Sequence, residues 1–400
     1  MGSEQKFSEI EKRPGPPDVT PVDVADIDRH RSLAHSSLEQ FLRQRIIKSH
    51  ARRQELWQRD YSSVEAYRRS LEPMRRRLKE ILGYWIEPSE RPPVRVRDQQ
   101  VLYETPEFRA TRFTIPIADA FETYGIELIP AVGRGRQPAR PRPGLLVQHG
   151  YGGCPELVCG FTKDANSEDY SYRSLGLRAA KRGFHVVAIH HPAGYGSAES
   201  VATDVPLPDV RSPGAKNSQN RLHRLATLDG GTLFGLYMLA SSRGVDLLLS
   251  RGVTSIGMYG LSQGGTSALF LPAIDERISA SVCSAYFNQR LAKLIGPHRA
   301  TCYLDWQAED IFLCDFTRYF GDSDLVSLIA PRAFAVEAGV KDTSVDFEKS
   351  TAEFDAARVH YQKLGIENRI EFIAHAEGHV SATRRAFEFL ELHVARAASP

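Results

Sequence analysis

The sequence predicts an α/β fold, with a mostly parallel central sheet and helices on both of its faces. After about residue 105, short runs of β-forming residues alternate with amphipathic stretches of helical length. These runs are apolar, as expected of strands that are buried on both faces. The chain has 400 residues, 42% of them hydrophobic, which is enough to build a substantial core.

The N-terminal part of the chain lacks this alternation. Residues 1–30 are rich in Pro and Asp and are expected to form a flexible arm. From Ser36 to about Gly83, apolar residues recur at steps of three and four, which predicts helices. Pro73 is expected to kink the second helix or to divide it in two. The arginines of this helical segment, residues 31–104, are interspersed with Glu and Asp, which favours a solvated face over a surface for anionic ligands.

The remaining chain, residues 105–400, is expected to form one α/β domain. Strands are predicted at 108–115, 124–132, 144–149, 184–190, 253–259, 278–285, 332–338 and 369–375, the first two as a possible antiparallel edge. Helices are predicted at about 172–183, 221–250, 263–273, 346–364 and 382–396. Residues 286–330 interrupt this rhythm and are predicted to be an insertion.

Composition and charge argue against several classes of protein. The 51 basic and 49 acidic residues give a net charge of only +2, which offers no general electrostatic case for binding nucleic acid or a membrane. No apolar run is long enough for a membrane helix, and the N-terminus has none that could serve as a secretory signal. The five cysteines are scattered, and the Cys154/Cys159 pair lacks the further ligands of a metal site. We therefore expect a cytoplasmic protein without metal or organic cofactor.

The stretch M-Y-G-L-S-Q-G-G at 258–265 contains the strongest candidate for a nucleophile. Ser262 lies between a predicted strand and a predicted helix, which is the context of a nucleophile elbow. Gly260 and Gly264 suit a tight turn in which backbone segments approach closely. The helix N-terminus would direct N–H groups towards developing negative charge.

A serine hydroxyl needs a base, and residues later in the chain can supply one. Asp342 follows one predicted strand, and His379 follows the last, so that Ser, Asp and His occur in the order expected for this architecture. Three alternatives stay open. Glu337 or Asp346 could replace Asp342, although Glu337 lies within a strand and Asp346 could cap a helix; His375 could replace His379.

An oxyanion hole is predicted from backbone N–H groups. The run H-G-Y-G-G at 149–153 follows a predicted strand and could turn its amides towards the reacting carbonyl. We expect one donor to be the N–H of Gln263, directly after the nucleophile, and the other that of Tyr151. The alternative is a plain glycine turn.

Together, these motifs resemble the α/β-hydrolase superfamily and, within it, the acetylxylan esterase, cephalosporin deacetylase and dienelactone-hydrolase-like enzymes. The resemblance covers roughly 105–397 and includes H-G-Y-G-G, H-H-P-A-G-Y-G-S-A-E-S, G-L-S-Q-G-G and A-E-G-H-V in the expected order. It implies that Ser262 is acylated, that His379 acts as general base and then acid, and that Asp342 orients it. It also implies that the 286–330 insertion roofs the site, with Tyr286, His298, Trp306, Phe312 and Phe316 as candidates for lining it.

The chain also departs from the family pattern. His190-His191-Pro192 stands where such enzymes often have Asp followed by Arg-Gly, so that pocket contacts at this turn do not carry over. Residues 31–104 are not part of the compact family core and could form a cap or an oligomer contact. Dienelactone hydrolases have cysteine as nucleophile, whereas a serine favours ordinary ester cleavage.

The sequence thus predicts a serine carboxylester hydrolase, expected to deacetylate a small or medium polar substrate. The expected partner is a small-molecule ester, with a homo-oligomer possible and no nucleic acid or membrane. A peptidase or an acyl transferase could use the same triad. A catalytically silent hydrolase fold that binds a small molecule or a protein is the alternative from another class.

Overall fold

The computed structural model of the protein describes residues 15, 20–131, 142–162, 171–192, 213–297, 302–305, 308–381 and 383–397. Most of the expected N-terminal arm, most of the H-H-P-A-G-Y-G-S-A-E-S turn, His298 and Trp306 lie outside these residues. The chain divides into two units, Met1–Lys48 and Ser49–Pro400, and each is considered by itself.

A nine-stranded sheet organises the larger unit, in the order β1-β2-β3-β5-β4-β6-β7-β8-β9. Its strands are β1 (Arg97–Glu104), β2 (Phe108–Ala118), β3 (Phe121–Pro130), β4 (Gly144–Gln148), β5 (His185–Ile189), β6 (Ile256–Leu261), β7 (Ile278–Ser284), β8 (Ala333–Gly339) and β9 (Ile370–His375). The six strands β4 to β9 are parallel to one another. The other three, β1, β2 and β3, form an antiparallel edge. The predicted mostly parallel sheet is confirmed. β1 was not predicted, because its run R-D-Q-Q-V-L-Y-E is polar and largely exposed.

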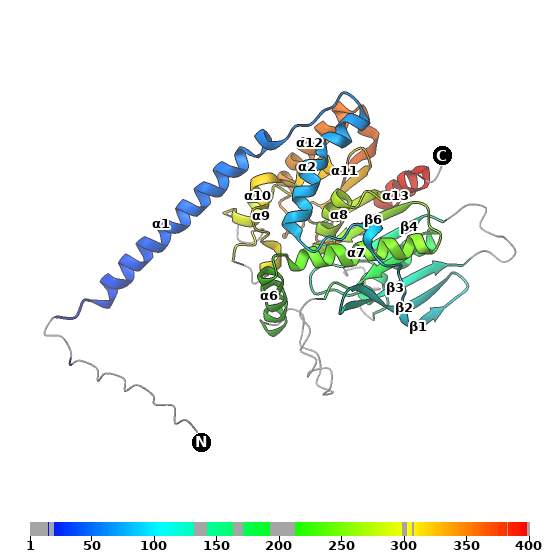
Figure 1. The fold of residues 1–400 in the computed structure, drawn as a ribbon, viewed down its shortest axis with the longest axis horizontal. Helices are drawn as coiled ribbons and strands as arrows, with labels where there is room; N and C mark the ends of the chain where they lie inside the picture. The colour runs from blue at the N-terminus through cyan, green and yellow to red at the C-terminus, as the bar shows by residue number, and fades with distance from the viewer. Residues whose placement is uncertain are drawn as a thin grey trace, which may run out of the picture. The chain divides into compact units, whose positions relative to one another are not determined.

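Helices cover both faces of this sheet (Figure 1). The helices are α2 (Val64–Leu82), α3 (Pro155–Cys159), α4 (Leu175–Lys181), α6 (Pro213–Leu228), α7 (Leu233–Ser250), α8 (Gln263–Ile274), α9 (Arg290–Ile295), α10 (Phe316–Tyr319), α11 (Asp322–Ile329), α12 (Phe347–Lys363) and α13 (Arg384–Ala397). Short 3₁₀ turns lie at η1 (Arg53–Leu56), η2 (Pro88–Glu90), η4 (Glu309–Ile311) and η5 (Glu367–Arg369). One hydrophobic core includes side chains of α2, α7, α8, α11 and α12, and the other includes side chains of α3, α4 and α13.

Two predicted helices differ from the structure for local reasons. The single helix expected over 221–250 is divided into α6 and α7, since Gly230 takes a positive φ of 83° and Thr232 caps the N-terminus of α7. Conversely, α2 runs through Pro73 as one element, so of the two effects predicted for Pro73, a kink or a division, the division is wrong. Its Tyr67 and Leu71 are completely buried, and this packing offsets the backbone hydrogen bond that Pro73 cannot donate.

The smaller unit consists mainly of one helix. The helix α1 (Val24–Ala51) begins within the stretch expected to be an arm and extends into the start of the larger unit. Arg43 pairs with Glu39 one turn away at 2.7 Å, an i,i+4 contact of the kind that stabilises exposed helices by a few tenths of a kcal/mol, about 0.3–0.5.

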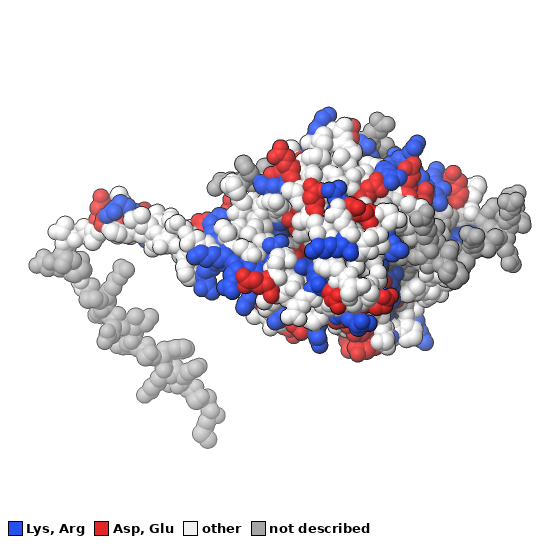
Figure 2. All heavy atoms as spheres, turned by 90° about the horizontal axis from the view of Figure 1, so that it is seen from above, with Lys and Arg blue, Asp and Glu red and all other residues white. Residues whose placement is uncertain are grey.

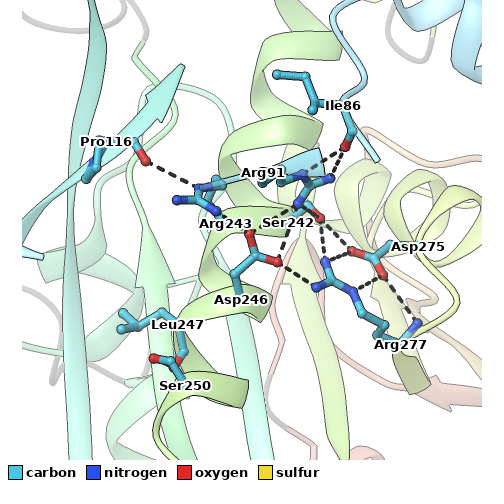
Figure 3. A network of polar contacts seen from close by, with 10 residues as sticks. All are labelled: Ile86, Arg91, Pro116, Ser242, Arg243, Asp246, Leu247, Ser250, Asp275 and Arg277. Atoms are coloured by element: carbon cyan, nitrogen blue, oxygen red, sulfur yellow. Dashed lines mark hydrogen bonds and ion pairs between the residues drawn. The ribbon is translucent and has the colours of Figure 1, made fainter. Parts of the chain in front are cut away.

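A polar network ties the segment after α2 to the main helical layer (Figure 3). Asp246 of α7 accepts from the guanidinium groups of Arg243 and Arg277 at 2.6 Å each, and Arg91 approaches it at 3.4 Å. Arg91 also donates to the Ile86 carbonyl oxygen and to the Ser242 hydroxyl. Arg91 and Arg243 are almost fully shielded from solvent, so removing the carboxylate would leave both without an ion-pair partner among the described residues, while Arg277 would keep Asp275.

The surface carries charges of both signs. Figure 2 shows Lys and Arg side chains interspersed with Asp and Glu over the visible face of the larger unit. Several arginines of the N-terminal helical segment pair with carboxylates, including Arg77 with Glu80 and Arg68 with Glu276. Within the part of the chain that the structure describes, no helix combines the length and the apolar character needed to cross a membrane.

Candidate active site

Ser262 lies at a sharp turn between β6 and α8. Its φ of 61° and ψ of −120° are a conformation that a non-glycine residue adopts only when its surroundings enforce it, at a cost on the order of 1–3 kcal/mol. The Ser262 N–H donates to the Ser284 carbonyl oxygen at 2.9 Å, and its own carbonyl oxygen accepts from the Thr266 N–H at 2.9 Å, the first turn of α8. Strain of this kind concentrates at functional sites and is typical of a nucleophile elbow.

Glycines make this turn sterically possible. A Cβ atom on Gly260 would lie 2.0 Å from the Gly264 carbonyl oxygen, and one on Gly264 would lie 2.2 Å from the Gln148 carbonyl oxygen. A Cβ on Gly265 would lie 2.4 Å from the Ser284 carbonyl oxygen. Each of these contacts is with backbone, so no side-chain rotation relieves it. The start of α8 is therefore pressed against β4 and β7, which fixes the place of the serine between them.

The structure brings Asp342 and His379 together. His379 Nδ1 lies 2.8 Å from Asp342 Oδ2, and the Asp342 side chain is fully shielded from solvent. Because an ionised carboxylate only accepts hydrogen bonds, the proton of a neutral His379 lies on Nδ1 and leaves Nε2 free to act as a base. Asp342 Oδ1 accepts from the Ser344 N–H at 2.7 Å, which holds the carboxylate in place.

The loops that carry these two residues are joined by backbone contacts. The Val340 N–H donates to the His375 carbonyl oxygen at 2.9 Å, and the Lys341 N–H donates to the Glu377 carbonyl oxygen at 3.1 Å. A Cβ on Gly339 would lie 2.3 Å from the Gly378 carbonyl oxygen, so only glycine allows this approach. The parallel pairing of β8 and β9 thus continues beyond the sheet edge.

The alternative residues occupy other roles. Glu337 lies within β8, fully buried, and accepts from the Tyr259 hydroxyl at 2.6 Å and from the Thr383 N–H at 3.0 Å. Asp346 caps α12 by accepting from the Lys349 N–H at 3.1 Å. Both nitrogens of His375, at the end of β9, are buried without a hydrogen-bond partner among the described residues. Glu337 and Asp346 thus make other hydrogen bonds, and the His375 side chain makes none among the described residues. None of these contacts involves the Asp342–His379 pair.

The loop after β4 lies against the serine. A Cβ on Gly150 would lie 3.1 Å from Ser262 Cβ, and the Gly150 N–H donates to the Tyr172 hydroxyl at 2.7 Å. The His149 side chain joins this loop to the segment after β5. Its Nε2 accepts from the His191 N–H at 3.1 Å, so its Nδ1 carries the proton and donates to the Gly150 carbonyl oxygen at 2.9 Å.

The two expected oxyanion donors have no hydrogen-bond partner in the part of the chain that the structure describes. Among the described residues, neither the Tyr151 N–H nor the Gln263 N–H donates to another group. Gln263 is the first residue of α8, so its N–H is one of the orphan donors at the helix N-terminus. Burial, with a further contribution from Asp310, raises the pKa of the Tyr151 hydroxyl to about 12, so this side chain is neutral at pH 7.

A chain of contacts connects the histidine loop with the serine. The Ser381 N–H donates to the Ser171 carbonyl oxygen at 2.9 Å, and the next residue, Tyr172, reaches Gly150 beside Ser262. Among the described residues, no hydrogen bond joins Ser262 Oγ to His379. Unliganded sites often hold this contact long until substrate binds.

Three of the residues expected to line the site, Tyr286, Phe312 and Phe316, are buried or partly buried in the structure. Tyr286 and Phe316 belong to the hydrophobic core, where Phe316 stacks on Phe270. Phe312 is partly buried against the same core. One residue that the sequence did not single out, Asp310 of η4, is fully buried and accepts from the Gln263 side chain at 2.9 Å. No local motif marks it, because its contact joins residues 47 positions apart.

The described residues also include no group of three or more His, Cys, Asp or Glu side chains that could hold a metal ion. Among the three neighbouring histidines, the ring of His149 stacks on that of His190 and meets that of His191 edge to face. Burial lowers the pKa of His149 to about 4 and that of His190 to about 3, so both are neutral at pH 7.

Comparison with known proteins identifies the fold. No family model matches the chain. A Bacillus subtilis (strain 168) protein named "Putative hydrolase YtaP" is 27% identical over 208 residues, which cover 50% of this chain and 61% of that protein, less than two thirds of its length.

Two solved structures are similar over most of the chain. A "putative acetyl xylan esterase" from Bacteroides fragilis NCTC 9343 has a TM-score of 0.58 at 17% identity, covering 82% of this chain and 80% of that one. A glucuronoyl esterase from Solibacter usitatus has a TM-score of 0.57 at 15% identity, covering 85% of this chain and 94% of that one. With the parallel sheet and the strand–Ser262–helix turn, these likenesses establish the α/β-hydrolase fold.

Proposed function

We propose that this chain, which has the α/β-hydrolase fold, is a serine carboxylester hydrolase. The observation that carries the proposal is the strained backbone of Ser262, at φ 61° and ψ −120°, between β6 and α8. A serine held in this way has no structural need for a side chain, since glycine would adopt the same conformation at lower cost. A serine at this position is therefore best explained by a function of its hydroxyl group.

The proposed reaction follows the double-displacement route of serine hydrolases. Ser262 Oγ attacks the ester carbonyl carbon while His379 Nε2 takes the hydroxyl proton, and Asp342 stabilises the resulting imidazolium. The N–H groups of Gln263 and Tyr151 stabilise the oxyanion. His379 then gives the proton to the departing alcohol, which leaves an acyl group on Ser262. A water molecule, deprotonated by His379, releases the acid and restores the free serine.

The proposed substrate is a small or medium polar ester, from which the enzyme removes an acetyl group. Support comes from the names of two solved structures with this fold, an acetyl xylan esterase and a glucuronoyl esterase, although at 17% and 15% identity they establish only the fold. The five cysteines are free thiols, which is consistent with a reducing compartment such as the cytoplasm.

The test is hydrolysis of 4-nitrophenyl acetate by the wild type and by Ser262→Ala. We expect the variant to lose at least about 10³-fold in kcat, as loss of the nucleophile does in serine hydrolases. Ser250→Ala, at an exposed serine near the end of α7, is the matched control and should retain the wild-type rate. A Ser262→Ala variant with the wild-type rate would overturn the assignment.

A fluorophosphonate probe separates an enzyme from a silent binding protein. The wild type should acquire one covalent label at Ser262, visible as a mass shift of the peptide that contains it. A binding protein without an activated serine would remain unlabelled. Comparison of an acetyl ester with an aminoacyl amide then separates an esterase from a peptidase.

A further inference from the structure

The carboxyl group of Asp310 is unusual because it is buried without a counter-charge. Asp322 and Asp324, from the same region, each pair with arginine, Asp322 with Arg290 and Asp324 with Arg53. By contrast, no Lys, Arg or His of the described chain forms an ion pair with Asp310, which has no solvent exposure. Burying a carboxylate in this way is costly unless something compensates it, and such groups concentrate at functional sites.

The position of Asp310 is fixed by its neighbour in η4. Glu309 pairs with Arg224 of α6, and the Glu309 N–H donates to the Asn220 side chain at 3.0 Å. These contacts join η4 to α6, and Asp310 of η4 contacts Gln263 at the start of α8.

The hydrogen bond between Gln263 and Asp310 determines which way the glutamine amide faces. Gln263 Nε2 lies 2.9 Å from Asp310 Oδ2. Burial raises the pKa of Asp310 to about 6, and the Gln219 and Gln263 amides act in the opposite direction, so the group is mainly ionised at pH 7 and above. An ionised carboxylate only accepts, so it selects the NH₂ group of Gln263 and turns Oε1 away.

The oxygen atom that is turned away has no partner. Gln263 Oε1 accepts no hydrogen bond from any described residue, yet it is not among the polar atoms sealed from solvent without a partner, whereas Asp310 Oδ1 and Gln219 Nε2 are. Gln263 retains 8% of its exposure. Its Oε1 is therefore an accessible acceptor on the residue next to the nucleophile, whose backbone N–H is a proposed oxyanion donor.

We propose that Asp310 and Gln263 form a specificity device that selects esters bearing a hydroxyl group close to the scissile bond. Gln263 Oε1 accepts the hydrogen bond of that hydroxyl, and Asp310 acts as a positioning residue that prevents the amide from turning its NH₂ group to the substrate. This inference rests on the proposed esterase function and adds a substrate class to it. A substrate without a donor leaves the acceptor unpaired in the enzyme–substrate complex, and so it reacts more slowly.

The test compares substrates that differ only in hydroxyl groups. Glycerol 1-acetate and propyl acetate differ on the alcohol side of the ester, and methyl lactate and methyl propionate differ on the acyl side. For each pair, the ratio of the two kcat/KM values is measured in a pH-stat at pH 8, where Asp310 is ionised. Comparing ratios between variants cancels the intrinsic reactivity of the esters.

Asp310→Asn is the principal variant, because an asparagine has the same shape but can donate as well as accept. It should lower the ratio for one of the two pairs about tenfold, the size of one hydrogen bond. Gln263→Met removes the acceptor altogether and should lower the ratio of the same pair, which also covers the case in which Asp310→Asn does not fold. Asp355→Asn makes the same substitution at an exposed aspartate of α12 and should leave both ratios at the wild-type value.

The outcomes separate this inference from the function on which it rests. Unchanged ratios in both Asp310→Asn and Gln263→Met, or an equal change in Asp355→Asn, would overturn the inference and leave the esterase function standing. If the wild type shows no Ser262-dependent hydrolysis of any of the four esters or of 4-nitrophenyl acetate, the proposed function falls, and the inference falls with it.

Discussion

Replacement of Gly264 by alanine should separate the geometry of the elbow from the stability of the fold. The new Cβ would lie 2.2 Å from the Gln148 carbonyl oxygen and 2.8 Å from that of His149, closer than the 3.0 Å below which real Cβ contacts essentially do not occur. Gln148 cannot retreat easily, because β4 pairs with β5 on one side and with β6 on the other, and its side chain donates to the Ile189 carbonyl oxygen. The start of α8 must therefore move.

The magnitude follows from the size of that movement. Restoring an ordinary contact requires a displacement of about 1 Å, and misplacement of a reacting group by 1 Å can cost about 10²-fold in rate. Overpacking of this kind also destabilises a fold by about 1–3 kcal/mol. We therefore expect Gly264→Ala to lower kcat for 4-nitrophenyl acetate about 100-fold while KM changes little, and to lower the melting temperature by several degrees.

Gly252→Ala provides the control for stability. Gly252 has a φ of +80° after the end of α7, and no heavy atom lies within 4 Å of an added Cβ. The substitution should cost about 1–2 kcal/mol through backbone strain alone, with kcat unchanged. If Gly264→Ala loses stability as Gly252→Ala does but keeps the wild-type kcat, the close approach of α8 to β4 does not position the nucleophile.

Three further predictions concern the site, the core and the response to acid. Asp342→Asn should lower kcat by about 10⁴-fold without unfolding the protein, since an asparagine stabilises the wrong histidine tautomer; circular dichroism and a fluorophosphonate titration check this. Asp246→Ala should cost about 3–5 kcal/mol in the free energy of unfolding, measured in urea, because the buried guanidinium of Arg243 loses its counter-charge, whereas Arg277 keeps Asp275. Burial lowers the pKa of His149 to about 4 and that of His360 to about 3, so the folded protein keeps both neutral while the unfolded chain protonates them below about pH 6.5. Stability should therefore be retained above pH 6.5 and fall by several kcal/mol as the pH drops towards 4, as urea unfolding at a series of pH values would show; a constant free energy of unfolding over that range would contradict it.

The sequence predicts the central fold well because its signals are local. Each parallel strand is a short apolar run that is buried along its length, as in β4 and β5, because helices cover both faces of the sheet. The prediction fails where local signals are weak or are overridden by packing. Strand β1 is polar because it lies at the exposed edge of the sheet, and α2 accommodates Pro73 because its opposite face is buried in the core.

The same distinction explains which residues of the candidate site could be found in the sequence. Ser262, Asp342 and His379 each follow a strand, and parallel strands deliver their C-terminal ends to one edge, so strand order alone predicts that they converge. Asp310 follows no strand and matches no motif.

What distinguishes Asp310 is that it is buried without a cation and touches the residue after the nucleophile, and both properties depend on how an irregular segment lies over α8. Parts of an active site that set substrate choice often have this character, because loops vary while the sheet edge beneath them is retained. The candidate catalytic residues can thus be predicted from short sequence motifs. The proposed selectivity, by contrast, depends on contacts between distant residues that form only when the chain folds.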